Sequence, residues 1–159
     1  MKLSFLFFGN QPDEKWQLCK QMGIDYAIAK LAPELTGEPS IDNYNSFARS
    51  KEIFEEQGFK LIGLEGDQMD MTNIKLGLNG REKDIDRYCK MLENMGRLGV
   101  DFICYNFMFT GWYRTHNALP ERGGALVSGF NYESALKEPD NKYACSENKM
   151  GKLQWFIDR

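Results

Sequence analysis

The sequence contains very little histidine and has no surplus of positive charge. A single histidine, His116, occurs among the 159 residues, so these residues cannot complete a metal site built on two or three histidines. The 20 lysine and arginine residues stand against 23 acidic residues, which gives a net charge of −3. This balance provides no basic stripe for a nucleic acid or an anionic membrane surface. We therefore expect neither of these partners, and we assign no metal ligand within the sequence.

Long apolar runs and closely spaced cysteines are also lacking. The first apolar run ends at Gly9, too early for a membrane span, and no small-residue cleavage site of a signal peptide follows it. The four cysteines form no CxxC pair, and their wide, irregular spacing favours reduced thiols over a zinc site or a disulfide framework. The sequence therefore predicts a cytoplasmic protein.

The common motifs for phosphate binding and for nucleophilic catalysis are missing as well. Residues 122–125 read Arg-Gly-Gly-Ala and lack the GxxxxGK[ST] spacing of a phosphate loop. Neither GxGxxG nor the GxSxG elbow of hydrolases occurs. From spacing alone, the glycines of this segment indicate a flexible loop.

What the sequence does contain is an apolar fraction of 42%, enough for the core of one domain, arranged as alternating strand and helix patterns. Helices are predicted from Asp13 to Met22, from a cap at Ser40 or Asp42 up to Gly58, and around residues 85–95. Loops are expected at 31–40 and 65–80. Apolar runs predict four strands, at residues 3–8, 25–29, 59–64 and 101–107. The first has the continuous pattern of a strand buried on both faces, and the fourth is expected to be buried as well.

This alternation predicts right-handed βαβ units and a parallel sheet. A complete (β/α)8 barrel usually needs about 250 residues and rarely fewer than about 200, so the length excludes a complete one. Beyond residue 108 the alternation stops, and a long polar loop precedes a short helix at 149–158. The predicted fold class is α/β, a parallel-stranded partial TIM barrel of about four βα units plus that loop and helix, in a single domain over residues 1–159.

In parallel α/β proteins, side chains at the carboxyl ends of strands line the functional site. Glu65 follows the third strand and could accept a substrate hydroxyl, act as a base or support a metal ligand; the alternative is a solvated loop acid. After the fourth strand, Asn106 offers an amide, Trp112 an apolar wall for a sugar-like substrate, and Arg114 a fork for a carboxylate or phosphate. Here the alternative is an exposed loop with packed aromatics. Residues 9–10 end the first strand and are a further candidate.

Several segments resemble the mannonate dehydratase family, and the resemblance covers nearly the whole chain. Glu65 also stands where that family has a strand ending in a glutamate, whereas Leu6-Phe7-Phe8 replaces the Arg-Trp-Tyr of many members. The matching segments are Ile74-Lys75-Leu76-Gly77-Leu78-Asn79-Gly80-Arg81-Glu82, Glu93-Asn94-Met95-Gly96-Arg97-Leu98-Gly99, Ile103-Cys104-Tyr105-Asn106-Phe107-Met108, Gly111-Trp112-Tyr113-Arg114-Thr115 and Arg122-Gly123-Gly124-Ala125.

The resemblance implies the N-terminal half of a barrel of the xylose-isomerase-like kind. It implies a lyase that converts D-mannonate, an aldonate, to 2-dehydro-3-deoxy-D-gluconate and water in hexuronate (glucuronate) breakdown. It also implies Mn²⁺ or Fe²⁺, held by residues of later strands that these 159 residues do not include, so the chain alone is expected to be inactive. The residues expected on the substrate-facing wall are Glu65, Asn106, Trp112, Arg114 and Arg122.

Two alternatives remain open at this point. The first is a sugar isomerase or epimerase of the same barrel type, because the first half of such barrels carries little chemistry that defines the reaction. The second is a non-enzymatic half-barrel that pairs with another copy of itself, because four parallel strands without closure leave two unpaired edges. A homo-oligomer is therefore a further expectation.

Overall fold

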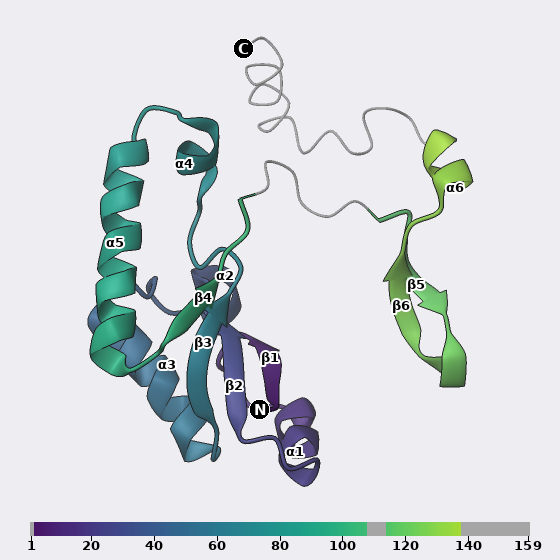
Figure 1. Ribbon diagram of the computed structural model, residues 1–159, viewed down its shortest axis with the longest axis horizontal. Coiled ribbons are helices and arrows are strands. Elements are labelled where there is room, and N and C mark those ends of the chain that lie inside the picture. The colour runs from purple at the N-terminus through teal and green to yellow at the C-terminus, as the bar shows by residue number, and fades with distance from the viewer. Residues whose placement is uncertain (1, 108–113, 138–159) are drawn as a thin grey trace. The chain divides into compact units, whose positions relative to one another are not determined.

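The computed structural model describes residues 2–107 and 114–137, which belong to two compact units (Figure 1). The first unit ends at Phe107 and the second begins at Met108. The helix predicted at residues 149–158 lies outside the described residues. A single domain over residues 1–159 therefore stays a prediction.

The first unit is built on a four-stranded sheet in which every neighbouring pair of strands is parallel. This confirms the predicted parallel sheet, although the fourth strand is shorter than the apolar run at 101–107 suggested. The strands lie in chain order, as expected when each helical connection leads to the adjacent strand. They are β1 (Ser4–Phe8), β2 (Tyr26–Lys30), β3 (Lys60–Glu65) and β4 (Phe102–Cys104).

Five helices connect these strands, and three of them match the predicted helices. The two short ones lie inside segments predicted to be loops. The first of these helices begins at Pro33 and ends before Gly37, which has a φ of 72°. The proline and glycine that indicated a loop thus begin and end a single helical turn. No helix of the described segments is both long and apolar enough to cross a membrane. The helices are α1 (Glu14–Gln21), α2 (Pro33–Thr36), α3 (Tyr44–Glu56), α4 (Thr72–Leu76) and α5 (Arg81–Leu98).

Side-chain caps fix where the two first long helices begin. The Asp13 carboxylate accepts hydrogen bonds from the backbone N–H groups of Lys15 and Trp16, as the sequence predicts. The cap of α3 is Asn43, so the prediction of Ser40 or Asp42 was wrong. The Asp42 carboxylate instead accepts two hydrogen bonds from an arginine of α5, described below.

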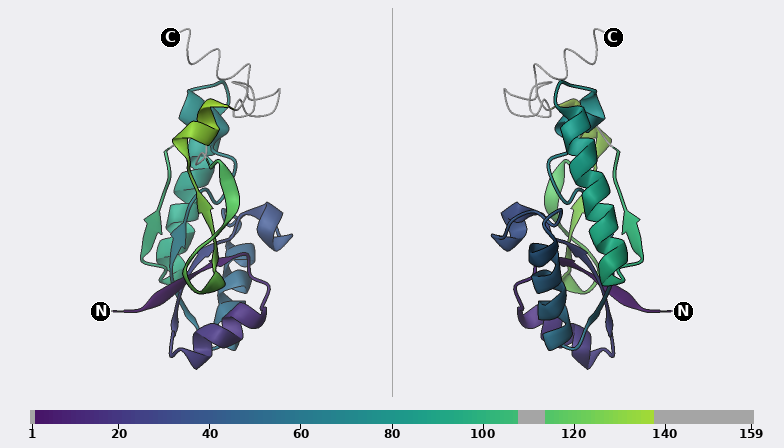
Figure 2. Two further views of the ribbon diagram at one scale, coloured as in Figure 1. Left: turned by 90° about the vertical axis from the view of Figure 1, so that its right-hand side faces the viewer. Right: turned by 90° about the vertical axis from the view of Figure 1, so that its left-hand side faces the viewer.

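An aromatic cluster forms the centre of the core between the sheet and helices α1 and α3. The Trp16 and Phe54 rings stack at 4.4 Å, and Phe7 and Phe59 pack edge-on or tilted against them with centroids 4.7–5.6 Å apart. Phe54 is fully buried. Helix α5 packs beside α3 (Figure 2). Met91 and Met95 of α5 extend the same core. The first unit therefore buries one face of its sheet.

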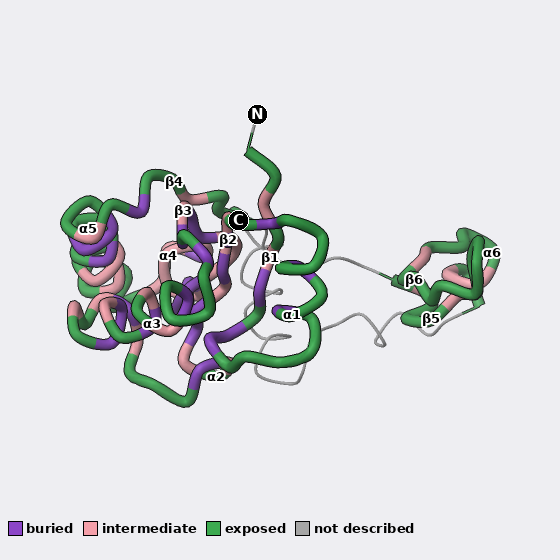
Figure 3. Tube along the Cα trace, turned by 90° about the horizontal axis from the view of Figure 1, so that it is seen from below, coloured by how far each residue is buried: buried purple, intermediate pink, exposed green. Residues whose placement is uncertain are grey.

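The other face of the sheet, which we call the open face, is not covered by the described residues of the unit. It carries Leu6 and Phe8 of β1, Ile28 of β2 and Phe102 of β4, which alternate with the side chains that point into the core. Phe8 is 69% exposed and Phe102 39% exposed. The predictions that the first strand is buried on both faces and that the fourth is buried were therefore wrong, and Figure 3 shows exposed segments in both strands. The apolar pattern is present, but the layer that would cover it is not among the described residues.

The second unit contains a β-hairpin where the sequence predicted only a long polar loop. Strands β5 (His116–Pro120) and β6 (Leu126–Gly129) pair antiparallel around the turn η1 (Arg122–Gly124), and α6 (Tyr132–Leu136) follows. Gly123, at φ 72°, permits the turn. The residues described in this unit bury almost no side chain, and the apolar Leu126, Phe130 and Leu136 are 55–68% exposed. Without its own core, this segment has no hydrophobic pattern from which the hairpin could be predicted.

The aromatic core yields a stability prediction. Replacing the fully buried Phe54 with alanine removes its stacking on Trp16 and leaves a cavity, so we expect a loss of about 3–5 kcal/mol in the free energy of unfolding. The matched control, Phe8→Ala, removes the same side chain from the open face and should cost less than about 1 kcal/mol. Urea unfolding followed by tryptophan fluorescence measures both. Equal losses in the two variants would contradict this location of the core.

A polar connection fixes the start of α3 against α5. Arg87 donates hydrogen bonds of 3.0 and 3.3 Å to the two carboxylate oxygens of Asp42. The buried Asn94 amide donates to the backbone oxygens of Ile41, at 3.2 Å, and of Asp42, at 2.9 Å. Burial by itself favours the neutral form of Asp42, but the hydrogen bonds and positive charge of Arg87 outweigh it. They hold the pKa of the Asp42 carboxyl below its usual range.

This lowered pKa predicts how stability depends on pH. An ionised Asp42 stabilises the folded chain above the pKa of an unfolded aspartate, about 3.9, and this contribution is lost as the pH falls through the lower folded value. Asp42→Asn should therefore be less stable at neutral pH and lose less stability on acidification. The control Asp86→Asn changes an exposed acid of α5 and should follow the unmodified chain. Urea unfolding across the acid range tests this, and identical pH profiles for the three proteins would contradict it.

Candidate functional site

The carboxyl ends of the strands form one edge of the sheet, which we call the carboxyl edge. Backbone hydrogen bonds continue past the strands: Gly9 N–H donates to Lys30 at 2.8 Å, and Gly66 N–H donates to Cys104 at 2.8 Å. Gly9, at φ 85°, comes so close to α2 that a Cβ atom there would lie 2.8 Å from the Leu35 carbonyl oxygen. Glycine is therefore required at this position, and the turns that leave the strands are fixed in place.

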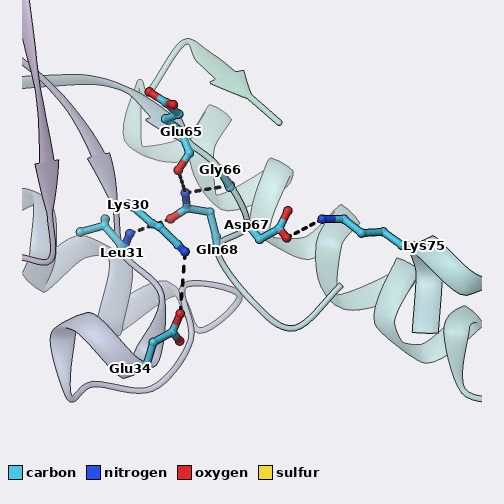
Figure 4. A network of polar contacts seen from close by, with 8 residues as sticks. All are labelled: Lys30, Leu31, Glu34, Glu65, Gly66, Asp67, Gln68 and Lys75. Carbon is cyan, nitrogen blue, oxygen red and sulfur yellow. Dashed lines mark hydrogen bonds and ion pairs between the residues drawn. The ribbon is translucent and has the colours of Figure 1, made fainter. Parts of the chain in front are cut away.

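Gln68 joins the ends of β2 and β3 at this edge (Figure 4). Its side-chain oxygen accepts a 2.7 Å hydrogen bond from the backbone N–H of Leu31. Its amide nitrogen donates to the backbone oxygens of Glu65, at 2.7 Å, and Gly66, at 3.1 Å. The side chain is almost fully buried, so these bonds replace water for each of the backbone groups. The residues that follow the two strands are thereby held in one arrangement.

The structure brings two of the predicted wall residues to neighbouring positions on the carboxyl edge. Glu65 is the last residue of β3 and pairs with Cys104 of β4. By strand alternation its side chain lies on the same face as Phe102, which is the open face. Asn106 follows β4, and its amide nitrogen lies 3.9 Å from the position that a Cβ atom on Gly66 would take. Both side chains are partly buried. A residue with a carboxylate acceptor and a residue with an amide donor thus occupy the ends of adjacent strands.

Asn10, the strand-end candidate after β1, has a different role. It is 2% exposed, and its amide nitrogen donates a 3.1 Å hydrogen bond to the hydroxyl of the buried Ser50 on α3. The residue therefore connects the end of β1 to the helix layer instead of facing a ligand on the open face.

A lysine at this edge was not predicted as a site residue. Lys30 is the last residue of β2, whereas the sequence pattern ended that strand at Ala29. Lys30 pairs with Phe8 on the neighbouring strand, and its ammonium nitrogen lies 3.9 Å from a carboxylate oxygen of Glu34. Lys30 could have been predicted from its position, because it is a charged residue directly after an apolar run. The same criterion identified Glu65 but was not applied to Lys30.

A second charged group lies close by. The Lys75 ammonium, with a side chain only 11% exposed, donates a 2.5 Å hydrogen bond to Asp67 in the loop after β3. Tyr88 of α5 lies near this pair, and its burial, together with Tyr105 and the negative charge of Asp67, raises the pKa of its phenol. Tyr88 therefore stays protonated and able to donate a hydrogen bond.

Two further predicted residues belong to the second unit. The Arg114 guanidinium donates a 3.3 Å hydrogen bond to the Ser128 hydroxyl at the base of the hairpin. Arg122 lies in the turn at the hairpin's other end and is exposed, so strand β5 separates the two arginines. Trp112 lies outside the described residues. A wall formed jointly by the five predicted residues stays a prediction.

The described residues do not fit a metal ion. Within 2–107 and 114–137, no three histidine, cysteine, aspartate or glutamate side chains gather closely enough to hold one. Of the described cysteines, Cys89 and Cys104 are exposed and unpaired, while burial, and secondarily the charge of Asp13, raises the pKa of the buried Cys19 thiol. That thiol is poorly suited to act as a thiolate ligand.

A shallow depression lies at the opposite, amino end of β3. It is bordered by Lys60, by Lys51 and Glu55 of α3, which form an ion pair, and by Gly99 after α5. None of the predicted site residues borders it. The depression therefore gives no reason to move the candidate site away from the carboxyl edge.

The Gln68 bridge yields a prediction. Gln68→Met keeps the approximate size of the side chain but leaves the Leu31 N–H and the Glu65 carbonyl buried without these partners. We expect the free energy of unfolding to fall by about 2–4 kcal/mol. Gln21→Met, at an exposed position of α1, is the matched control and should change stability by less than about 0.5 kcal/mol. Urea unfolding measures both, and an unaltered stability of Gln68→Met would show that the bridge contributes little.

Comparisons with known proteins agree on one family. Residues 1–152 match the family model of UxuA, described as D-mannonate dehydratase. A mannonate dehydratase of Thermotoga maritima is 32% identical over 126 residues, which are 76% of this chain and 34% of that protein. One of Enterococcus faecalis is 34% identical over 105 residues, 65% of this chain and 29% of that protein. The chain thus spans about a third of the length of these curated relatives.

A solved structure supports the fold. The crystal structure of mannonate dehydratase from Streptococcus suis serotype 2 superposes with a TM-score of 0.73 at 22% identity, over 99% of this chain and 48% of that chain. Together with the four parallel strands, this confirms the predicted partial TIM barrel. The family match over residues 1–152 confirms the resemblance seen in the sequence motifs. The chain belongs to the UxuA family of D-mannonate dehydratases.

Proposed function

We propose that this chain supplies part of the active site of a hydro-lyase that converts D-mannonate to 2-dehydro-3-deoxy-D-gluconate and water. The observation that carries the proposal is the pair of polar side chains, Glu65 and Asn106, that follow adjacent strands at the carboxyl edge. Catalytic barrels bind their substrates at this edge. Membership of the UxuA family supports D-mannonate, a small-molecule aldonate, as the substrate.

The reaction requires a proton to leave C2 and the bond between C3 and its hydroxyl to break. The hydroxyl departs as water, and the resulting enol tautomerises to the ketone. A site for this reaction has to orient a polyhydroxylated chain and its carboxylate. In our proposal the Glu65 carboxylate accepts a hydrogen bond from a substrate hydroxyl, and the Asn106 amide donates one to the substrate. We also propose that Trp112, Arg114 and Arg122 contact the substrate, with apolar cover from the indole and positive charge from the guanidinium groups.

The cofactor is a separate part of the proposal. We propose Mn²⁺ or Fe²⁺ for the family's reaction, but the described residues do not fit either ion. No step here depends on the metal, and the roles of the chain's own residues are limited to binding and orienting the substrate. The base that accepts the C2 proton and the acid that assists departure of the C3 hydroxyl are not assigned among them.

We further propose that the reaction serves glucuronate breakdown in the cytoplasm. Support for the compartment comes from Cys19, Cys89 and Cys104, which are unpaired in the structure. Support for the pathway comes from the family, whose substrate is a sugar acid.

A second candidate function is self-association of the half-barrel without catalysis. The observation that favours it is the open face, where Phe8 of the edge strand β1 is 69% exposed. In the first unit as described, β1 and β4 each lack a partner on one side, which invites pairing with another chain. A homo-oligomer would cover both edges.

Turnover of D-mannonate tests the proposed function. Because the chain spans about a third of its relatives' length, we expect the 159 residues alone to be inactive. A fusion protein tests the activity of the complete barrel. It joins this chain to the part of the Thermotoga maritima mannonate dehydratase that follows the segment matched by this chain, and with Mn²⁺ it should dehydrate D-mannonate. Glu65→Gln should lower kcat/KM at least about tenfold, because it loses a charged acceptor. Glu93→Gln, at an exposed site of α5, should leave kcat/KM unchanged.

Other results would point elsewhere. Turnover by the 159 residues alone would contradict the need for a longer barrel. Isomerisation of keto sugars instead of dehydration would favour the isomerase alternative. A monodisperse dimer of the 159-residue chain in light scattering, with no turnover by the joined protein, would favour the second candidate.

A further inference from the structure

A substrate that carries a carboxylate needs a positive charge at its binding site, and the carboxyl edge of the first unit offers two described lysines. Lys75 is engaged with Asp67 at 2.5 Å and is mostly buried. Lys30 has only a loose ion pair, 3.9 Å from Glu34, whose side chain is 66% exposed. Its ammonium group makes no hydrogen bond to any residue of the described segments. Of these two lysines, Lys30 is therefore the one whose charge is available for an anion.

The backbone around Lys30 is fixed more firmly than its side chain. The Lys30 carbonyl oxygen accepts from Gly9 N–H at 2.8 Å, and the next residue, Leu31, donates at 2.7 Å to the buried Gln68. Gln68 in turn binds the backbone of Glu65 and Gly66 (Figure 4). The origin of the Lys30 side chain is thus held at a set position beside the end of β3, while its ammonium group remains free to change partner.

Gly66 brings the lysine close to a second donor. A Cβ atom on Gly66 would lie 3.8 Å from Cδ of Lys30 and 3.9 Å from the amide nitrogen of Asn106. The two side chains therefore approach the same small space from β2 and from the end of β4. An ammonium group and an amide N–H can each bind one oxygen of a carboxylate.

Glu65 does not neutralise this pair of donors. Its carboxylate points away from the Lys30 ammonium group, which is directed towards Glu34 (Figure 4). No ion pair joins Lys30 to Glu65 among the described contacts. The carboxyl edge thus presents positive and negative groups in separate directions, suited to a ligand with an acid group at one end and hydroxyls further along.

We propose that Lys30 and Asn106 together bind the carboxylate of the substrate, and that Gln68 is the positioning residue that holds Lys30 beside Glu65. This inference rests on the proposed function, because it takes the aldonate as the ligand. It assigns Glu65 to the hydroxyl-bearing part of the same molecule. On binding, the Lys30 ammonium exchanges its exposed partner Glu34 for the substrate carboxylate.

The test uses the 159-residue chain and two probes, D-mannonate and its neutral amide, D-mannonamide. The NMR signal of the Lys30 Cε methylene group is identified by its loss in Lys30→Met and then followed during titration. We expect a saturable shift with D-mannonate and a much smaller one with D-mannonamide. Lys30→Met should weaken D-mannonate binding, followed through the Asn106 amide signals, at least about tenfold, and Lys30→Arg should restore most of it.

Two further variants separate a specific role from a structural one. Lys60→Met removes a lysine at the amino end of β3 and should leave the affinity unchanged. Glu34→Gln removes the competing acid and should tighten D-mannonate binding without affecting D-mannonamide. Gln68→Met should reduce the preference for the charged probe over the neutral one, which a mere loss of stability would not do.

The results of this binding test can be told apart from those of the turnover test of the proposed function. Equal shifts with both probes, no shift with either, or unaltered affinity in Lys30→Met would overturn the inference, even if the joined protein dehydrates D-mannonate. A charge-dependent shift of the Lys30 signal, together with weaker D-mannonate binding by Lys30→Met, would support it, even if the joined protein catalyses a different reaction of a sugar acid.

Discussion

Helices α1, α3 and α5 cover one face of the parallel sheet and leave the other face open. This one-sided packing determines which side chains of the first unit are buried in the core and which can meet a ligand. The aromatic cluster around Trp16 and Phe54 holds the helices to the sheet from one side only. Leu6, Phe8 and Phe102 carry the apolar pattern of a buried layer on the opposite side. A parallel sheet is normally covered on both faces, and the described residues of this unit cover only one, which fits a part of a larger barrel. The match to 48% of a solved mannonate dehydratase chain agrees with that interpretation.

The same one-sided packing explains why polar groups at the carboxyl edge are available for a ligand. Side chains that point into the helix layer are used for packing, as Asn10 shows by its bond to Ser50. Side chains on the open face meet no layer built from the described residues, and Lys30 and Glu65 are only partly buried. Gln68 keeps these flexible groups in register by binding the backbone beside them. A backbone held by hydrogen bonds beneath the charged side chains supports a binding wall at this edge.

Much of this fold could be predicted from the sequence because its strands and long helices carry strong periodic patterns. The candidate site was predicted in part: Glu65 and Asn106 follow clear apolar runs, while Lys30 was missed because β2 is rich in alanine and its end was placed one residue early. Gln68 could not be found from a pattern, since its importance lies in backbone contacts 37 residues apart. The hairpin of the second unit has exposed side chains and hence no periodic signal. The exposure of the first and fourth strands could not be predicted either. Their apolar pattern indicates that a layer covers them, but it does not show whether the described residues contain that layer.

The central claim is that the substrate binds at the carboxyl edge of this sheet. Hydrogen exchange measured by mass spectrometry, on the chain joined to the remainder of a relative's barrel, tests it most directly. With D-mannonate present, the account predicts slower amide exchange at residues 30–31, 65–68 and 104–106, and no change at residues 24–26 and 58–60 at the amino ends of β2 and β3. Slower exchange confined to the amino ends, or the same exchange with and without D-mannonate at saturation, would contradict it.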